Sequence, residues 1–239
     1  MSLDVLRPLA DRAALFTALR QDQLRAAADS LGEHRWDADL TARTLTFSSI
    51  SDPNRRIVAT AHLVASIAPG PRSVLWGWAH PMGAPDGVSA GIRAYGAQYG
   101  LSALTEPELP LGEAVAGEPE AWVAEVAHVI GGVAGELTGR APYYSAPTGG
   151  GARAVFVLDG VLGPLTVADA LIVLPRILQT TPMTDPRTSV WDLARLAAWQ
   201  LQWTDEAFRG AAVSDATGSA TFQFDEQARI TGIQSTLGG

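Results

Sequence analysis

One stretch, residues 56–67, constrains the fold more than any other part of the chain. Its sequence, RIVATAHLVASI, alternates between two largely apolar faces. One face carries Ile57, Ala59, Ala61, Leu63 and Ile67, and the other carries Val58, Thr60, His62, Val64 and Ser66. A strand that is apolar on both faces has to be covered on both sides, so we expect it at the centre of a sheet.

The residues that follow predict an antiparallel neighbour for this strand. APGP at residues 68–71 is a turn sequence, and a second alternating run, SVLWGWAH, comes shortly after it. In a continuous strand Val74, Trp76, Trp78 and His80 lie on one face. We therefore predict that Trp76 and Trp78 are both buried on one face of a sheet.

Helices are predicted around these strands. They cover residues 8–32, 87–99 and 119–138, and further helical segments begin near residue 161. Asp86 is the expected N-cap of the second helix, and Gly139 ends the third. Gly131 and Gly132 lie inside the third helix, where glycine is unfavourable, so we expect another segment to approach its backbone closely.

The C-terminal residues predict two helices and a hairpin. Thr166 with Asp169 and Ser189 with Asp192 have the spacing of capping boxes. Pro175 is expected to kink or end the first of these helices. The stretch SATFQFDEQARITGI, at residues 219–233, alternates around a turn and predicts a terminal hairpin.

The order of these elements predicts the fold class. A hairpin at residues 35–49 and an apolar strand at 152–159 complete the pattern, which lacks regular β-α-β alternation. We expect an α+β fold: a curved antiparallel sheet packed against several helices, cone-shaped as in cystatin-like and NTF2-like folds, with a C-terminal helix-hairpin extension. We expect residues 1–160 to form the core of the protein, a helix with the antiparallel sheet. Residues 161–239 are expected to pack on this core rather than fold independently.

Composition excludes several classes of function. The net charge is −8, and all 17 basic residues are arginines, scattered along the chain, which fits a GC-rich coding bias. Without a basic stripe we expect no nucleic-acid partner. The absence of cysteine excludes disulfides, thiolate nucleophiles and cysteine-ligated metals.

We expect a cytoplasmic protein with no membrane partner. Asp4 and Arg7 interrupt the N-terminal residues where a signal peptide needs an apolar run. The most apolar segment, residues 164–178, contains Asp169 and Arg176 and is too short to span a bilayer.

Three motifs carry a family resemblance. They are WDADLTARTLTF, the Trp-x-Trp of LWGWAH, and PYY before an apolar strand. Together they resemble an uncharacterised bacterial family, a domain of unknown function, over residues 31–159. The resemblance implies no activity. Asparagine is more frequent in that family at the position of His80, so the resemblance gives this histidine no catalytic role.

Aromatic residues are the candidate ligand-binding residues. Trp76, Trp78 and His80 form one wall of the expected cavity, and the tips of Tyr95, Tyr143 and Tyr144 complete it. The alternative is that the same side chains are core that packs against the helix at residues 8–32.

His62 is added to the binding residues because its strand neighbours that of His80. The two histidines have no evident third metal ligand and no HxH or HExxH spacing, so we assign no metal site and no cofactor. No nucleophile in a G-x-S-x-G turn accompanies them, so we assign no catalytic residue.

Three functions remain open from the sequence. The first is a non-enzymatic protein that binds an apolar small molecule or a protein partner at an aromatic-lined cavity. The second is a small-molecule hydrolase or isomerase that uses His62 or His80 as a general base. The third is a structural or dimerising module, for which a homodimer is one form.

Overall fold

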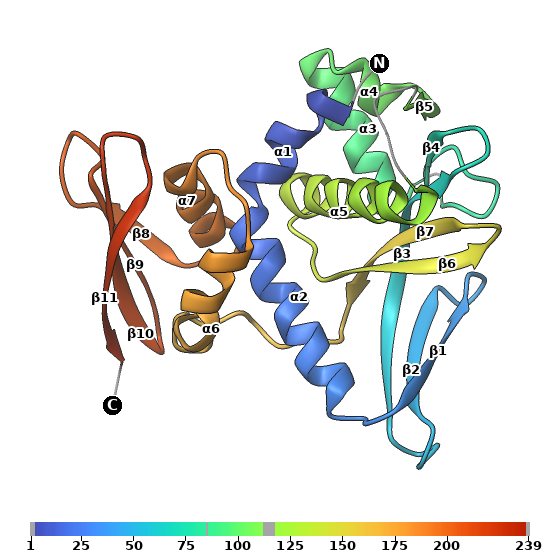
Figure 1. The fold of residues 1–239 in the computed structure, drawn as a ribbon, viewed down its shortest axis with the longest axis horizontal. Helices are drawn as coiled ribbons and strands as arrows, with labels where there is room; N and C mark the ends of the chain where they lie inside the picture. The colour runs from blue at the N-terminus through green and yellow to red at the C-terminus, as the bar shows by residue number, and fades with distance from the viewer. Residues whose placement is uncertain (1–2, 85, 112–117, 238–239) are drawn as a thin grey trace. The chain divides into compact units, whose positions relative to one another are not determined.

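The computed structural model describes residues 3–84, 86–111 and 118–237. The fold is α+β with antiparallel sheets, as predicted (Figure 1). The chain divides into two compact units: Met1–Ala10 with Gln23–Leu162, and Asp11–Asp22 with Gly163–Gly239. We call these the first unit and the second unit.

A strongly curled antiparallel sheet forms the first unit. In the described residues its strands run in the order β1 (His34–Asp39), β2 (Thr44–Ser49), β3 (Arg56–Ala68), β4 (Ser73–Trp76) and β5 (Glu108–Pro110). The other edge of β3 pairs with β7 (Ala152–Asp159), which also pairs with β6 (Tyr143–Gly149). The central position predicted for β3 is confirmed. Its first half is apolar on one face only, because Val58 is 48% exposed.

A β-bulge in β3 changes which residues share a face. The register with β7 shifts between Leu63 and Ala65. Ala61 lies in the core on one face of the sheet, whereas Val64 and Ile67 lie in the core on the other. The prediction that Ile67 shares a face with Ala61 is wrong because the extra residue of the bulge inverts the alternation.

The helices of the first unit include α3 (Val88–Tyr99), α4 (Ser102–Thr105) and α5 (Pro119–Thr138). Helix α5 starts at a proline and ends at Gly139, whose φ of 67° is left-handed, as predicted. The close approach predicted at its glycines is confirmed. A Cβ at Gly131 would overlap the Tyr143 ring, and one at Gly132 would lie 2.9 Å from the Cβ of Ala10.

Two sequence predictions about helices need correction. The helix expected at 8–32 is a 3-10 turn (Leu3–Val5) followed by α1 (Arg7–Arg12) and α2 (Ala14–Asp29), with a break at Ala13. The N-cap of α3 is Gly87, not Asp86, and no side chain caps that helix. Between α4 and α5, residues Glu108–Pro110 form the short strand β5.

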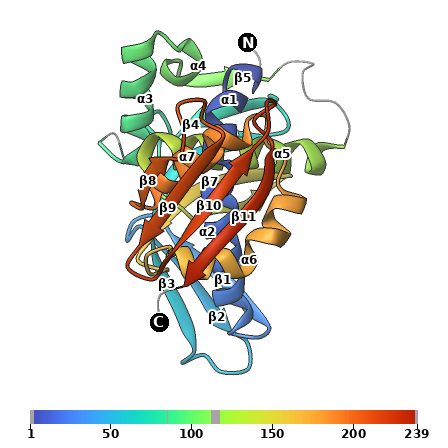
Figure 2. The ribbon, with the colours of Figure 1, turned by 90° about the vertical axis from the view of Figure 1, so that its left-hand side faces the viewer.

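The second unit contains α6 (Val167–Thr180), α7 (Pro186–Leu196) and a smaller sheet. The described strands of that sheet are β8 (Gln200–Trp203), β9 (Gly210–Asp215), β10 (Gly218–Phe224) and β11 (Ile230–Leu237), in the order β11-β10-β9-β8 (Figure 2). The terminal hairpin is confirmed as β10 and β11, but it is part of a larger sheet than predicted. Of the two effects predicted for Pro175, a kink or an end of the helix, the end does not occur, because α6 continues through it to Thr180.

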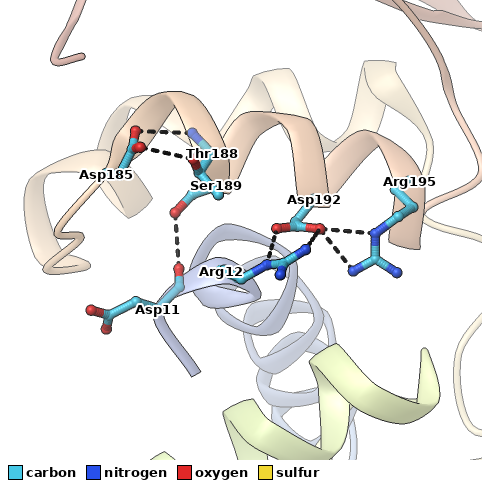
Figure 3. Close-up of polar contacts among 7 residues, drawn as sticks. All are labelled: Asp11, Arg12, Asp185, Thr188, Ser189, Asp192 and Arg195. Atoms are coloured by element: carbon cyan, nitrogen blue, oxygen red, sulfur yellow. Dashed lines mark hydrogen bonds and ion pairs between the residues drawn. The ribbon is translucent and has the colours of Figure 1, made fainter. Parts of the chain in front are cut away.

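A buried carboxylate links α7 to residues near the N-terminus (Figure 3). Asp192 is fully buried and accepts hydrogen bonds from Arg12 and Arg195, at 2.9 and 2.8 Å. Ser189 donates to the carbonyl of Asp11 at 2.9 Å. The capping box predicted at Ser189 and Asp192 is wrong because α7 begins earlier, with Asp185 as its N-cap. The box at the start of α6 is confirmed by the bond from the Asp169 N–H to Thr166 Oγ1.

Candidate functional site

The strand face predicted for Trp76, Trp78 and His80 does not form. Strand β4 ends at Trp76, and residues 77–79 form a turn whose first N–H, that of Gly77, still donates to the Val64 carbonyl of β3 at 2.7 Å. The His80 N–H donates to the Gly77 carbonyl at 3.3 Å within this turn. Gly77 lies so close to β3 that a Cβ there would overlap the Leu63 carbonyl. The glycine between the two tryptophans therefore marks the end of the strand rather than its middle.

The two tryptophans occupy different environments. Trp76 is fully buried, and its indole Nε1–H donates to the Ala103 carbonyl at 2.9 Å. Trp78 is half-buried beneath Arg93, whose guanidinium carbon lies 4.4 Å from the ring centroid. The Nε1–H of Trp78 is buried and has no hydrogen-bond partner among the described residues. Trp76 is therefore core, and any ligand contact of Trp78 stays a prediction.

His80 organises the loop that follows β4. Its Nδ1 accepts a hydrogen bond from the Met82 N–H at 3.0 Å. Burial lowers the pKa of His80, which keeps the ring neutral and able to accept that bond.

The three predicted tyrosines lie apart from one another. Their ring or hydrogen-bond partners are His128 for Tyr143, Phe47 and Trp36 for Tyr144, and Tyr99 for Tyr95. Burial raises the pKa of Tyr143 to about 12, so its hydroxyl stays protonated beside His128. Each tyrosine therefore has its own set of neighbours among the described residues.

A pocket of about 240 Å³ lies beside β3 where strand pairing is interrupted. Strand β2 pairs with β3 up to Thr60, and β4 pairs with it from Ala65, so in the described residues no strand pairs with that edge between them. Residues 61–63 line the pocket together with the β1–β2 loop, residues 81–84, the start of α3 and Phe156. We call it the β3-edge pocket.

His62 lines this pocket and is held by a carboxylate. Its Nε2 lies 3.0 Å from Asp159 Oδ2, and Arg140 pairs with the same oxygen. Burial lowers the pKa of His62, and the positive charges of Arg140 and Arg43 lower it further. The imidazole is therefore neutral at pH 7. With Nε2–H donating to Asp159, Nδ1 is left as a hydrogen-bond acceptor.

Arg43 brings a positive charge to the β3-edge pocket. Its backbone has a φ of 55°, and its carbonyl accepts a hydrogen bond from the Ala61 N–H at 2.8 Å, which fixes the β1–β2 loop on β3. Asp39 Oδ1 holds the same loop by accepting from the Thr41 N–H at 2.8 Å. Among the residues that the structure describes, none bonds to the Arg43 guanidinium and none that lines the pocket is acidic.

Sequence reasoning found His62 but missed its neighbours. Asp159 ends the strand at 152–159, and the β3–β7 register places it opposite Thr60, two residues from His62. That register was the missing information, because 97 residues separate the histidine from the aspartate. Arg43 lies in a hairpin turn, where sequence alone favours a solvated side chain.

Neither a metal site nor a membrane span is found in the described residues. No three or more His, Asp or Glu side chains there form a group that could hold a metal ion. No helix among them is long and apolar enough to cross a bilayer.

Fold and pocket together define an α+β protein with a curled antiparallel sheet and a small cationic pocket at its central strand. Residues 7–161 match the model of a family of unknown function, DUF6882, and the chain belongs to that family. No curated protein and no solved structure matches the chain. The resemblance predicted for residues 31–159 is thus confirmed.

Proposed function

We propose that this protein binds a small organic anion in the β3-edge pocket without chemically changing it. The guanidinium of Arg43 carries the proposal, because no described residue bonds to it and the described lining of its concave site has no acidic side chain. A carboxylate is the group that a guanidinium binds best through charge-assisted hydrogen bonds. The neutral His62 adds an acceptor for a hydroxyl or amide on the same ligand.

The lining and volume of the pocket support a small ligand with an apolar part. Leu40, Leu63 and Val88 supply apolar walls beside the two polar side chains. A volume of about 240 Å³ lies below the usual range for drug-sized ligands and corresponds to roughly eight water molecules. A short-chain or single-ring carboxylate fits these limits, whereas a dinucleotide does not.

Calorimetric titration with hexanoate and with its neutral analogue hexanamide tests this function. We expect saturable binding of hexanoate, and binding about tenfold weaker for the amide, because the amide lacks the charge that Arg43 pairs with. Arg43→Gln should weaken hexanoate binding by a similar factor. Arg35→Gln is the matched control, since Arg35 lies in the same hairpin and does not line the pocket. Equal affinity for acid and amide, or an unchanged affinity in Arg43→Gln, would contradict the proposal.

General-base catalysis is the second candidate, and the contact between His62 and Asp159 favours it. A histidine that donates through Nε2 to a carboxylate and has a free Nδ1 is oriented to take a proton from water or substrate. This candidate predicts turnover of small esters or ketones that rises with pH as His62 loses its proton. Turnover abolished by His62→Gln would replace the binding proposal with a hydrolase or an isomerase.

We also propose, from composition, a cytoplasmic location, a bacterial source and no nucleic-acid partner. The last is supported by the net charge of −8 and by the scattered arginines.

A further inference from the structure

A second pocket, of about 250 Å³, lies in the second unit, outside the residues that match the family model. Arg187, Thr188 and Trp191 of α7 line it on one side, and Trp203 of β8 and Phe208 of the β8–β9 loop line it on the other. We call it the α7–β8 pocket. Of the five described residues that line it, three are aromatic, which is the composition predicted around Trp76.

Phe208 occupies a conformation that favours glycine. Its φ is 56°, in the left-handed region, where a bulky side chain is rarely found. The ring is 48% exposed and meets Trp203 edge to face, at 5.1 Å between centroids and 83° between planes. An exposed ring gives little burial energy in return for this backbone strain, so folding alone does not account for the residue.

Trp191 is held in place by charged neighbours. It is 38% exposed, and the guanidinium carbon of Arg195 lies 5.6 Å from its ring centroid. The buried Asp192 fixes Arg195 through a 2.8 Å hydrogen bond. The ring is thus positioned by a salt bridge within its own helix, which is how a binding surface is kept ordered before a ligand arrives.

The charge of the α7–β8 pocket is positive. Arg187 donates to the Phe208 carbonyl at 3.3 Å, and no carboxylate of a described residue pairs with it. None of the five lining side chains is acidic. The site therefore offers aromatic rings for stacking and one guanidinium, whose remaining N–H groups can donate hydrogen bonds to a ligand.

We propose that the α7–β8 pocket binds an aromatic carboxylate. The ring of the ligand would pack among Trp191, Trp203 and Phe208, and its carboxylate would accept hydrogen bonds from Arg187. Aromatic contacts select a planar ring over an aliphatic chain of the same size, since they add to the burial of apolar area. The guanidinium selects the acid over its amide.

Tryptophan fluorescence tests this site separately from the β3-edge pocket, whose lining contains no tryptophan. The probe is 4-nitrobenzoate, whose nitro group quenches indole emission, and the neutral comparison is 4-nitrobenzamide. We expect saturable quenching by the acid and about tenfold weaker binding of the amide. Cyclohexanecarboxylate, which has the charge without the aromatic ring, should compete weakly.

Substitutions test whether the quenching comes from 4-nitrobenzoate bound in the α7–β8 pocket. Arg187→Gln should weaken 4-nitrobenzoate binding by about tenfold, whereas Arg209→Gln and Arg43→Gln should leave it unchanged, since neither arginine lines the pocket. Phe208→Gly should abolish saturation while raising thermal stability, because glycine adopts the left-handed conformation without strain. Linear, non-saturable quenching, equal affinity for acid and amide, or full affinity in Arg187→Gln would overturn the assignment.

Discussion

At the scale of single residues, the two tryptophans of LWGWAH differ in one hydrogen bond. Trp76 donates to the Ala103 carbonyl, whereas the buried indole N–H of Trp78 has no partner in the described part of the chain. A buried donor without a partner keeps its desolvation cost, so a tryptophan is not the most stabilising side chain at position 78.

Phenylalanine substitutions measure this difference. Trp76→Phe should destabilise the protein by about 2–4 kcal/mol, because it leaves the Ala103 carbonyl unpaired and a void in a closed core. Trp78→Phe should change the free energy of unfolding by less than about 1 kcal/mol, since the lost ring volume is offset by removal of the unpartnered donor. Urea unfolding followed by circular dichroism gives both values. Equal destabilisation by the two substitutions would contradict the conclusion that the Trp78 indole N–H lacks a hydrogen-bond partner.

Backbone conformation at single residues also coincides with the two pockets. Arg43 and Phe208 both have a left-handed φ, at 55° and 56°, and each lines one pocket. Neither position is glycine, although glycine would adopt the conformation without strain. Arg72, Ala198 and Ala228 have the same conformation and line neither pocket, so the left-handed φ accompanies the two binding proposals but does not by itself mark a binding residue.

At the scale of elements, α5 depends on two glycines in its middle. Gly131 packs beneath the Tyr143 ring, and Gly132 packs against Ala10. Alanine normally stabilises a helix interior relative to glycine. In α5 a methyl group at either position would meet a neighbouring segment, so packing reverses the intrinsic preference.

Paired glycine-to-alanine substitutions test this packing. Gly131→Ala should destabilise by about 1–3 kcal/mol, because the Tyr143 ring has to move. Gly91→Ala in α3 is the control: a Cβ there has no neighbour within 4 Å, so the substitution should stabilise by about 0.5–1 kcal/mol. Chemical unfolding of the two variants gives the sign of the change in unfolding free energy for each. Stabilisation by Gly131→Ala would show that the close approach is not maintained in solution.

The sequence predicted elements well where local chemistry decides them. Pro119 and Gly139 delimit α5 because proline and glycine act on their own backbone. No strand was predicted at residues 200–203 and 210–215. Strand β9 forms there by pairing with β10, and β8 forms by pairing with β9. The bulge after Leu63 could not be predicted either, since it appears only once β7 sets the register.

The candidate pocket was predicted only in part, for the same reason. His62 was selected because its strand neighbours that of His80, but its ring is held by Asp159, and the pocket lies where β2 and β4 leave a gap on one edge of β3. Gaps and registers arise from long-range pairing, which a local pattern does not encode. The strand face expected for Trp76, Trp78 and His80 does not form because the alternation was extended through Gly77, where the strand has already ended.

At the scale of the whole molecule, the family match and the structural division do not coincide. The family model covers residues 7–161, yet residues 11–22 of that stretch belong to the second unit. Polar contacts tie them to residues 163–239. They include Arg12 with Asp192, Asp11 with Ser189 and Thr184, and Asp22 with Arg176.

These contacts predict that residues 163–239 do not fold alone. Without Arg12, the buried Asp192 keeps Arg195 as its one ion-pair partner among the described residues, and a buried carboxylate that loses a partner is strongly destabilising. The fragment 163–239 should therefore show no cooperative thermal transition.

A fragment in which residues 11–22 are joined to residue 163 by a glycine-serine linker should show a cooperative transition again, since the effective concentration of residues 11–22 is then high. Asp192→Asn in the linked fragment should lower its midpoint, because the contact with Arg12 loses its charge. A cooperative transition in 163–239 by itself would show that residues 11–22 only rest on a unit that is already stable, and that the family boundary near residue 161 is also a folding boundary.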